Sequence, residues 1–235
     1  MYFPMYYGFD SGYILVIIAA IFSMIASFKV NSTFKKYSEK LTGRQITAEQ
    51  AARKILDSNG LHHVRIEGIA GNLTDHFDPK ANVIRLSDSV RYSTSVAAVG
   101  VAAHEAGHAV QHATGYVPIK IRGALVPAAN IGSMVGPYII ILGLILGSIP
   151  QLIDIGIILF SAAALFQIVT LPVEFNASNR AIKILENDMY LEADEVPAVK
   201  KVLGAAAMTY VAAAAASIAT LLRYILLASG RRNDD

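Results

Sequence analysis

Long apolar stretches are the feature that most limits the folds open to this chain. Residues 13–28, 131–149, 152–171 and 204–227 are each long enough, with a few flanking residues, to cross a hydrocarbon layer about 30 Å thick as a helix. The 235 residues are 54% hydrophobic and 16% charged, which is more apolar surface than one soluble core of this size needs. We therefore expect a mainly α membrane protein whose transmembrane helices carry a smaller polar part.

The residues around the first stretch predict its orientation. Residues 1–12 contain aromatic side chains typical of a membrane interface but no Lys or Arg, whereas residues 29–44 contain several Lys and Arg. The positive-inside rule then places the N-terminus outside and the chain from residue 29 onward in the cytosol. A cleaved signal peptide would need a basic region before the apolar run, and none is present. We expect residues 1–30 to be a retained transmembrane anchor.

The second and third stretches are joined by a short uncharged segment, which predicts a transmembrane helical hairpin over residues 123–171. Four glycines in the first arm recur at spacings that keep them on one helix face: Gly132, Gly136, Gly143 and Gly147. Such a face suits close packing against another helix. The partner helix belongs either to this chain or to a second copy, so a homo-oligomer through this face is one expectation.

The last stretch, in the segment 204–235, is Ala-rich and contains Arg223. Its length favours a fourth span, with Arg223 reaching toward the interface. A fourth crossing would place Arg231 and Arg232 outside, against the charge rule. The alternative is a helix that packs on the polar domain or lies in the interface.

Residues 31–122 have the composition of a small α+β domain. Thr47 and Gln50 form a capping box for a helix over residues 47–59, which Gly60 ends. Short alternating runs at residues 64–68, 73–77 and 82–86 predict strands separated by turns. The last of these strands is expected either to be an exposed edge that pairs with an extended peptide or to pack as a plain hairpin.

The motif His104-Glu105-Ala106-Gly107-His108 lies in residues 97–116, a segment that otherwise has the composition of an apolar helix. Residues four apart share one helix face, so both imidazoles can bind one metal ion, and Glu105 can take a proton from a water molecule on that ion. Burying these side chains among Ala and Val is costly without strong partners. The chain has no Cys, so a zinc site must use His and carboxylate ligands.

Catalytic zinc takes three protein ligands. His112 lies about 11 Å along the axis from His104, too far to share a metal with bonds of about 2 Å. Two crossings between residues 131 and 171 return the chain to the side it left, and Glu174 is the first carboxylate to follow. Glu174 is therefore the expected third ligand. The alternative is a solvated glutamate at a helix start.

The HEAGH helix, the hydrophobic hairpin and the segment LPVEFNASNRA at residues 171–181 resemble the YugP-type neutral zinc metallopeptidases of bacterial membranes. The chain is more distantly similar to the HtpX and CAAX prenyl protease group, in which two His and a Glu from an E-x-x-x-D helix hold zinc. This resemblance implies a zincin-like (gluzincin) catalytic domain and one Zn²⁺ on His104, His108 and Glu174, with Glu105 as general base. The helix that carries the third ligand is expected within residues 172–203.

One position departs from the distant group, because Ser178 stands where that group has Asp. Asn176, Ser178, Asn179 and Arg180 are the candidates for residues that orient the ligands through hydrogen bonds. For the donor that stabilises an oxyanion, side-chain type suggests Arg180, His76 or Tyr92.

These observations predict a multi-pass zinc endopeptidase of the bacterial cell membrane that acts on peptides or membrane-protein segments at the cytosolic side. The net charge of +2 and the lack of a basic groove pattern argue against nucleic acid as a partner. Two alternatives stay open. One is a site-2-type intramembrane protease, which the apolar residues 96–110 suggest although no aspartate segment of that class is present. The other is a zinc-binding membrane scaffold or assembly factor without catalysis.

Overall fold

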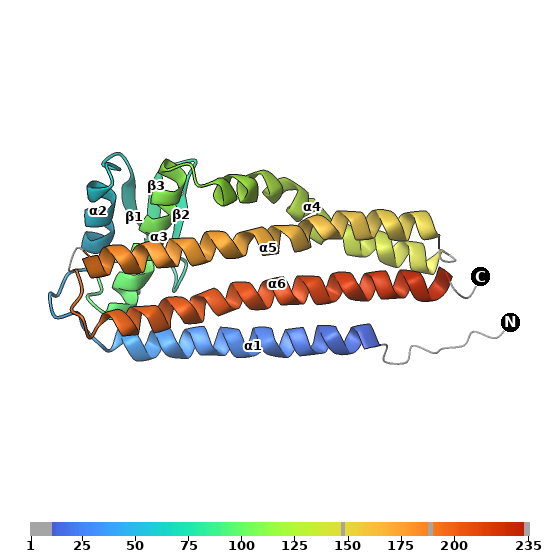
Figure 1. The fold of residues 1–235 in the computed structure, drawn as a ribbon, viewed down its shortest axis with the longest axis horizontal. Coiled ribbons are helices and arrows are strands. Elements are labelled where there is room, and N and C mark those ends of the chain that lie inside the picture. Colours follow the sequence, from blue (N-terminus) through green and yellow to red (C-terminus); the bar gives the residue numbers. More distant parts are fainter. Residues whose placement is uncertain (1–10, 147–148, 188–189, 233–235) are drawn as a thin grey trace. The chain divides into compact units, whose positions relative to one another are not determined.

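The computed structural model describes residues 11–146, 149–187 and 190–232. Over these residues the order of elements, shown in Figure 1, is α1 (Ser11–Ser38), α2 (Ala48–Ser58), β1 (Arg65–Ile69), β2 (His76–Asp78), β3 (Val83–Ser87), α3 (Val96–Ala113), α4 (Val117–Ile145), α5 (Pro150–Asn187) and α6 (Val196–Arg232). The aromatic cluster predicted within residues 2–9, and Gly147, lie outside the described residues. The expectation of a mainly helical chain with a small sheet is confirmed.

Among the residues that the structure describes, four helices are able by length and composition to cross a membrane: α1, α4, α5 and α6. The mean hydropathy of their most apolar windows lies between 1.7 and 2.3. The set includes α6, the helix for which the sequence left two placements open.

The chain forms two compact units. Over the described residues, the first comprises residues 11–25, 122–146, 149–169 and 210–232, and the second comprises residues 26–121, 170–187 and 190–209. The sequence predicts that the hairpin ends at residue 171 and that Glu174 lies on a separate helix. In the structure, α5 runs through residue 171 as one helix with Pro172 inside it. A proline removes one backbone hydrogen bond, and here the helix continues beyond that loss. The link predicted over residues 191–201 is also partly helical, because α6 begins at Val196.

In the first unit, the glycine face of α4 packs against α5 of the same chain. A Cβ on Gly132 would collide with the backbone carbonyl of Leu159, and one on Gly136 would lie 3.0 Å from the carbonyl oxygen of Gly156. The helices therefore approach closely because these positions have no side chain. The hairpin partner of these glycines is intramolecular, and a homo-oligomer through the same face stays a prediction.

In the second unit, three strands form a sheet in the order β1-β3-β2. β1 pairs with β3 in parallel and β2 pairs with β3 antiparallel. The expectation that β3 is an exposed edge is wrong, because β3 has a partner on each side. The free edges belong to β1 and β2, a consequence of the parallel β1–β3 pairing that the strand pattern alone does not indicate.

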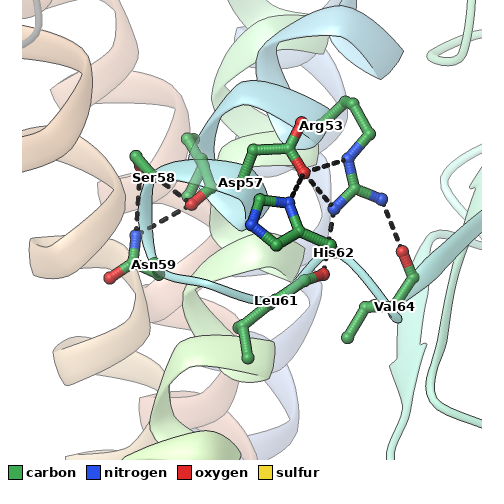
Figure 2. A network of polar contacts seen from close by, with 8 residues as sticks. Arg53, Asp57, Ser58, Asn59, Leu61, His62 and Val64 are labelled. Carbon is green, nitrogen blue, oxygen red and sulfur yellow. Dashed lines mark hydrogen bonds and ion pairs between the residues drawn. The ribbon is translucent and has the colours of Figure 1, made fainter.

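Helix α2 begins with the predicted capping box, in which Thr47 accepts from the backbone N–H of Gln50 and the Gln50 side chain accepts from that of Thr47. At its other end, Arg53 donates to Asp57 and to the carbonyl oxygens of Leu61 and Val64 (Figure 2). These bonds fix the turn that leads into β1, because one guanidinium satisfies two backbone acceptors at once.

Helix α3 lies in the core of the second unit. Ser95 caps its first turn, and Gly115, with a φ of 65°, follows its last turn in a conformation that favours glycine. Almost every residue from Val96 to Gln111 is buried, and the core cluster around it draws on α2, β3, α5 and α6. An all-round apolar helix of this kind is expected inside a domain. Its polar side chains are therefore held in an apolar surround.

The hairpin packing yields a test with a matched control on the same helix. We expect Gly132→Ala to lower the free energy of unfolding by about 1–3 kcal/mol, because the new Cβ has no room beside the carbonyl of Leu159. A Cβ on Gly123 would meet no atom within 4 Å, so Gly123→Ala should be neutral or stabilise by up to about 1 kcal/mol. Thermal unfolding in detergent measures both. A Gly132→Ala protein as stable as Gly123→Ala would contradict the close packing.

Candidate metal and catalytic site

His104 and His108 of α3 and Glu174 of α5 meet within the second unit. Their candidate ligand atoms all lie within 4.8 Å of one another. The Nε2 atoms of His104 and His108 lie 3.2 and 3.4 Å from the same oxygen of Glu174, Oε2. The side chain of Glu174 is only 3% exposed, so its carboxylate is shielded from water and has the two imidazoles as polar partners.

The separation of each imidazole from the carboxylate fits a tetrahedral metal. Bonds of about 2.0–2.1 Å at tetrahedral angles place two ligand atoms about 3.3 Å apart. Both imidazole-to-carboxylate distances agree with this value. Two imidazoles and a carboxylate are also a donor set that suits Zn²⁺, so the residues present are able to hold the ion that the sequence implies.

Gly107, inside the H-E-x-x-H motif, allows the two helices to meet. A Cβ at this position would lie 2.7 Å from the carbonyl oxygen of Ala177 on α5. Any larger residue would push the helices apart at the turn between the two histidines. The glycine is therefore needed for the approach of Glu174, a role that the motif pattern does not specify.

His104 contacts Ser178, the residue that departs from the distant group. The Nδ1 atom of His104 lies 3.1 Å from the Ser178 hydroxyl oxygen. A hydroxyl both donates and accepts, so Ser178 can orient the ring without carrying the charge of an aspartate. The neighbouring candidate Asn179 is exposed on α5.

His108 contacts Gln111, a residue that sequence reasoning missed. The Nδ1 atom of His108 lies 3.0 Å from the Gln111 Oε1 atom, and Gln111 is fully buried. The Gln111 Nε2 atom donates to the carbonyl oxygen of Val173 and to Oδ1 of Asn176, which also accepts from Nε of Arg180. A polar residue on the buried face of an otherwise apolar helix, one turn after His108, was the available signal.

Glu105 lies on α3 beside the histidines and contacts the edge of the sheet. Its Oε2 atom accepts a hydrogen bond of 2.9 Å from the backbone N–H of Phe77 in β2. This N–H is on the free edge of β2, away from β3. One residue before β2, Asp75 accepts two hydrogen bonds from Ser87, and burial raises the pKa of Asp75 above its ordinary value despite them.

The remaining candidates are placed elsewhere. Tyr92 is 68% exposed and stacks with Arg91, and His76 contacts Thr74 and Arg85 on the sheet. The exposed His112 makes an edge contact with Phe77 at 6.0 Å between ring centroids. None of these contacts reaches the three candidate ligands.

The environment of His108 changes its acidity. Burial by itself lowers the pKa of His108, but the hydrogen bond with Glu174 and the negative charges of Glu105 and Glu174 outweigh burial and raise it. The site therefore attracts positive charge strongly. A proton and a metal ion compete for the same imidazole nitrogen, so acid should weaken metal binding.

Comparisons with known proteins agree with this chemistry. A family model described as "Putative neutral zinc metallopeptidase" matches residues 12–229. A protein of Bacillus subtilis (strain 168) named "Putative membrane protease YugP" is 46% identical over 224 residues, which cover 95% of this chain and 99% of that protein. No solved structure matches the chain. With a match over nearly its whole length, the chain belongs to this family of neutral zinc metallopeptidases.

Proposed function

We propose that the chain is a membrane-embedded, zinc-dependent endopeptidase of the zincin-like (gluzincin) type. The observation that carries the proposal is the convergence of His104, His108 and Glu174 on one point, with Glu105 in the same turn of α3. Family membership supports zinc as the metal, and one ion per chain follows from the single group of three ligands among the described residues.

When bound there, zinc supplies a Lewis acid that polarises a peptide carbonyl and makes a nearby water molecule more acidic. His104, His108 and Glu174 are the residues that would hold the ion. Glu105 accepts the proton of the attacking water and later passes it to the leaving amine. The Phe77 N–H holds the Glu105 carboxylate in place until then.

The substrate class follows from the setting of the site. One group on the free edge of β2, the Phe77 N–H, is used by Glu105. An extended peptide can pair with the rest of this edge, so we propose peptides or segments of membrane proteins as substrates. The helices able to span a membrane, among the described residues, are α1, α4, α5 and α6 and do not include α3. This weighs against the site-2 type of protease, in which the motif helix lies in the bilayer.

Two substitutions separate metal binding from catalysis. We expect Glu105→Gln to keep zinc and to lower peptide cleavage by about 10²–10⁴-fold, because the amide cannot accept the proton. Glu174→Ala should lower the zinc affinity by more than about 100-fold, the largest effect expected for a residue that only supports a ligand. Zinc content by metal analysis and cleavage of a casein-type substrate in detergent measure the two effects.

Glu186→Ala is the matched control, since Glu186 is an exposed glutamate further along α5. It should match the wild type in both measurements. Full zinc occupancy in Glu174→Ala would refute the third ligand, and undiminished cleavage by Glu105→Gln would refute the general base. If zinc is bound but no variant cleaves any substrate, the scaffold alternative is favoured.

The contact at Gly107 gives a second test. Gly107→Ala should weaken zinc binding and destabilise the protein by about 1–3 kcal/mol, because the methyl group meets a backbone carbonyl at 2.7 Å. Gly100→Ala on the same helix places a methyl group 3.2 Å from a side-chain methyl of Val199, not beside the backbone of α5, and should have a smaller effect on zinc. Equal zinc affinities in the two variants would show that the approach at Gly107 is not needed for the site.

We further propose that the second unit lies in the cytosol of a bacterial cell, because basic residues are concentrated after the first span. Reporter fusions after residues 45 and 150 should then report the cytosolic and the external side, respectively. A fusion after residue 232 should report the external side if α6 crosses the membrane. An external report at residue 45 would overturn the cytosolic site.

A further inference from the structure

Three side chains link His108 to the surface of α5: Gln111, Asn176 and Arg180. We propose that they form a positioning relay that fixes the proton of His108 on Nδ1 and so presents its Nε2 atom to the metal. The inference rests on the proposed zinc site and adds residues that orient a ligand without touching the ion.

The direction of the relay is set at Arg180. A guanidinium always donates and never accepts, so the Asn176 atom 2.8 Å from Arg180 Nε must be the carbonyl oxygen Oδ1. This removes the usual freedom of an amide to rotate by half a turn and exchange its oxygen and nitrogen. Arg180 is a residue of intermediate exposure, four positions after Asn176 on the same helix face.

The next link is Gln111, which is fully buried and reaches across from α3. Because Asn176 presents an oxygen that already accepts from Arg180, Gln111 must turn its amide nitrogen toward it, at 2.9 Å. The second hydrogen on that nitrogen goes to the carbonyl oxygen of Val173 at 2.8 Å. Both donors of Gln111 are thus used on α5, and its orientation is decided.

The last link is His108. With its nitrogen turned to α5, Gln111 offers Oε1 to the imidazole at 3.0 Å, and an oxygen acceptor requires a proton on Nδ1. The lone pair available for a metal is then on Nε2, the atom that lies 3.4 Å from Glu174 Oε2. Two acceptors on α5, the Val173 carbonyl and the Asn176 Oδ1 that Arg180 orients, therefore determine which nitrogen of a histidine on α3 binds the metal.

The two histidines differ in this respect. The partner of His104 is the hydroxyl of Ser178, which donates or accepts equally well and imposes no tautomer. The donor-only anchor acts on His108 alone. We therefore expect the metal affinity to depend on the donor at position 180, which supports the orientation that the Val173 carbonyl also favours.

The test compares Arg180→Lys with Arg180→Met. Lysine also only donates, so it should keep the relay and a zinc affinity near that of the wild type. Methionine keeps the length but not the donor, which frees Asn176 to rotate and to turn its amide N–H toward Gln111. The Val173 carbonyl then holds the orientation of Gln111 without the support of Asn176. Zinc affinity, measured by competition with a chromogenic chelator, should then fall on the order of 10- to 100-fold.

Lys183→Met is the control, because it removes the same charge from an exposed position one turn further along α5. It should leave zinc affinity unchanged. Gln111→Leu should weaken zinc at least as much as Arg180→Met. If circular dichroism shows that the buried substitution Gln111→Leu unfolds the protein, the comparison of Arg180→Lys with Arg180→Met alone tests the relay, because Arg180 is half-exposed.

Each outcome supports or overturns the inference. Wild-type affinity in Arg180→Met, or an equal loss in Arg180→Lys, would overturn the relay while leaving the zinc peptidase intact. A wild-type protein that binds zinc but cleaves nothing would count against the proposed function, while the zinc affinities would still test the relay. A wild-type protein that binds no zinc would overturn both.

Discussion

The approach of α3 to α5 at Gly107 is the constraint on which the candidate site depends. Side chains on one helix supply two imidazoles but no third ligand in reach, because the next histidine on that face is a further turn away. The third group has to come from another helix, and it reaches the imidazoles only if the backbones nearly touch. The absence of a side chain at Gly107, opposite the Ala177 carbonyl, makes that possible.

The close approach buries polar groups, and the surrounding residues satisfy them. Glu174, His108 and Gln111 lie among Ala and Val side chains, where an unpaired polar atom is costly. Glu174 has the two imidazoles as partners, and His108 has Glu174 on α5 and Gln111 on its own helix. Gln111 in turn donates to Val173 and Asn176 of α5. The same bonds that satisfy these groups hold the candidate ligands in one orientation, so stability and preorganisation come from one network.

Several elements could be predicted because their causes are local. The capping box of α2, the helix of the H-E-x-x-H motif and the four membrane-length helices depend on residues near one another in the chain, and the structure contains them all. The order of the strands could not be predicted, because β1 pairs in parallel with β3 although β2 lies between them in the sequence. The continuous α5 could not be predicted either, because Pro172 is a local signal for a helix end. The contact of Gln111 with Asn176 joins residues that are far apart in the chain.

By itself, the sequence determined the helices long and apolar enough to span a membrane, the motif and the choice of Glu174 as a candidate partner. Composition, helical spacing and the predicted parity of two crossings are enough for these, because each follows from length and periodicity. Only the tertiary structure decided that Glu174 Oε2 lies between both imidazoles, that Glu105 is held by the edge of β2, and that Gln111 faces His108. The physical reason is that these contacts depend on the distance and orientation between helices. The pattern of residues along the chain does not specify either quantity.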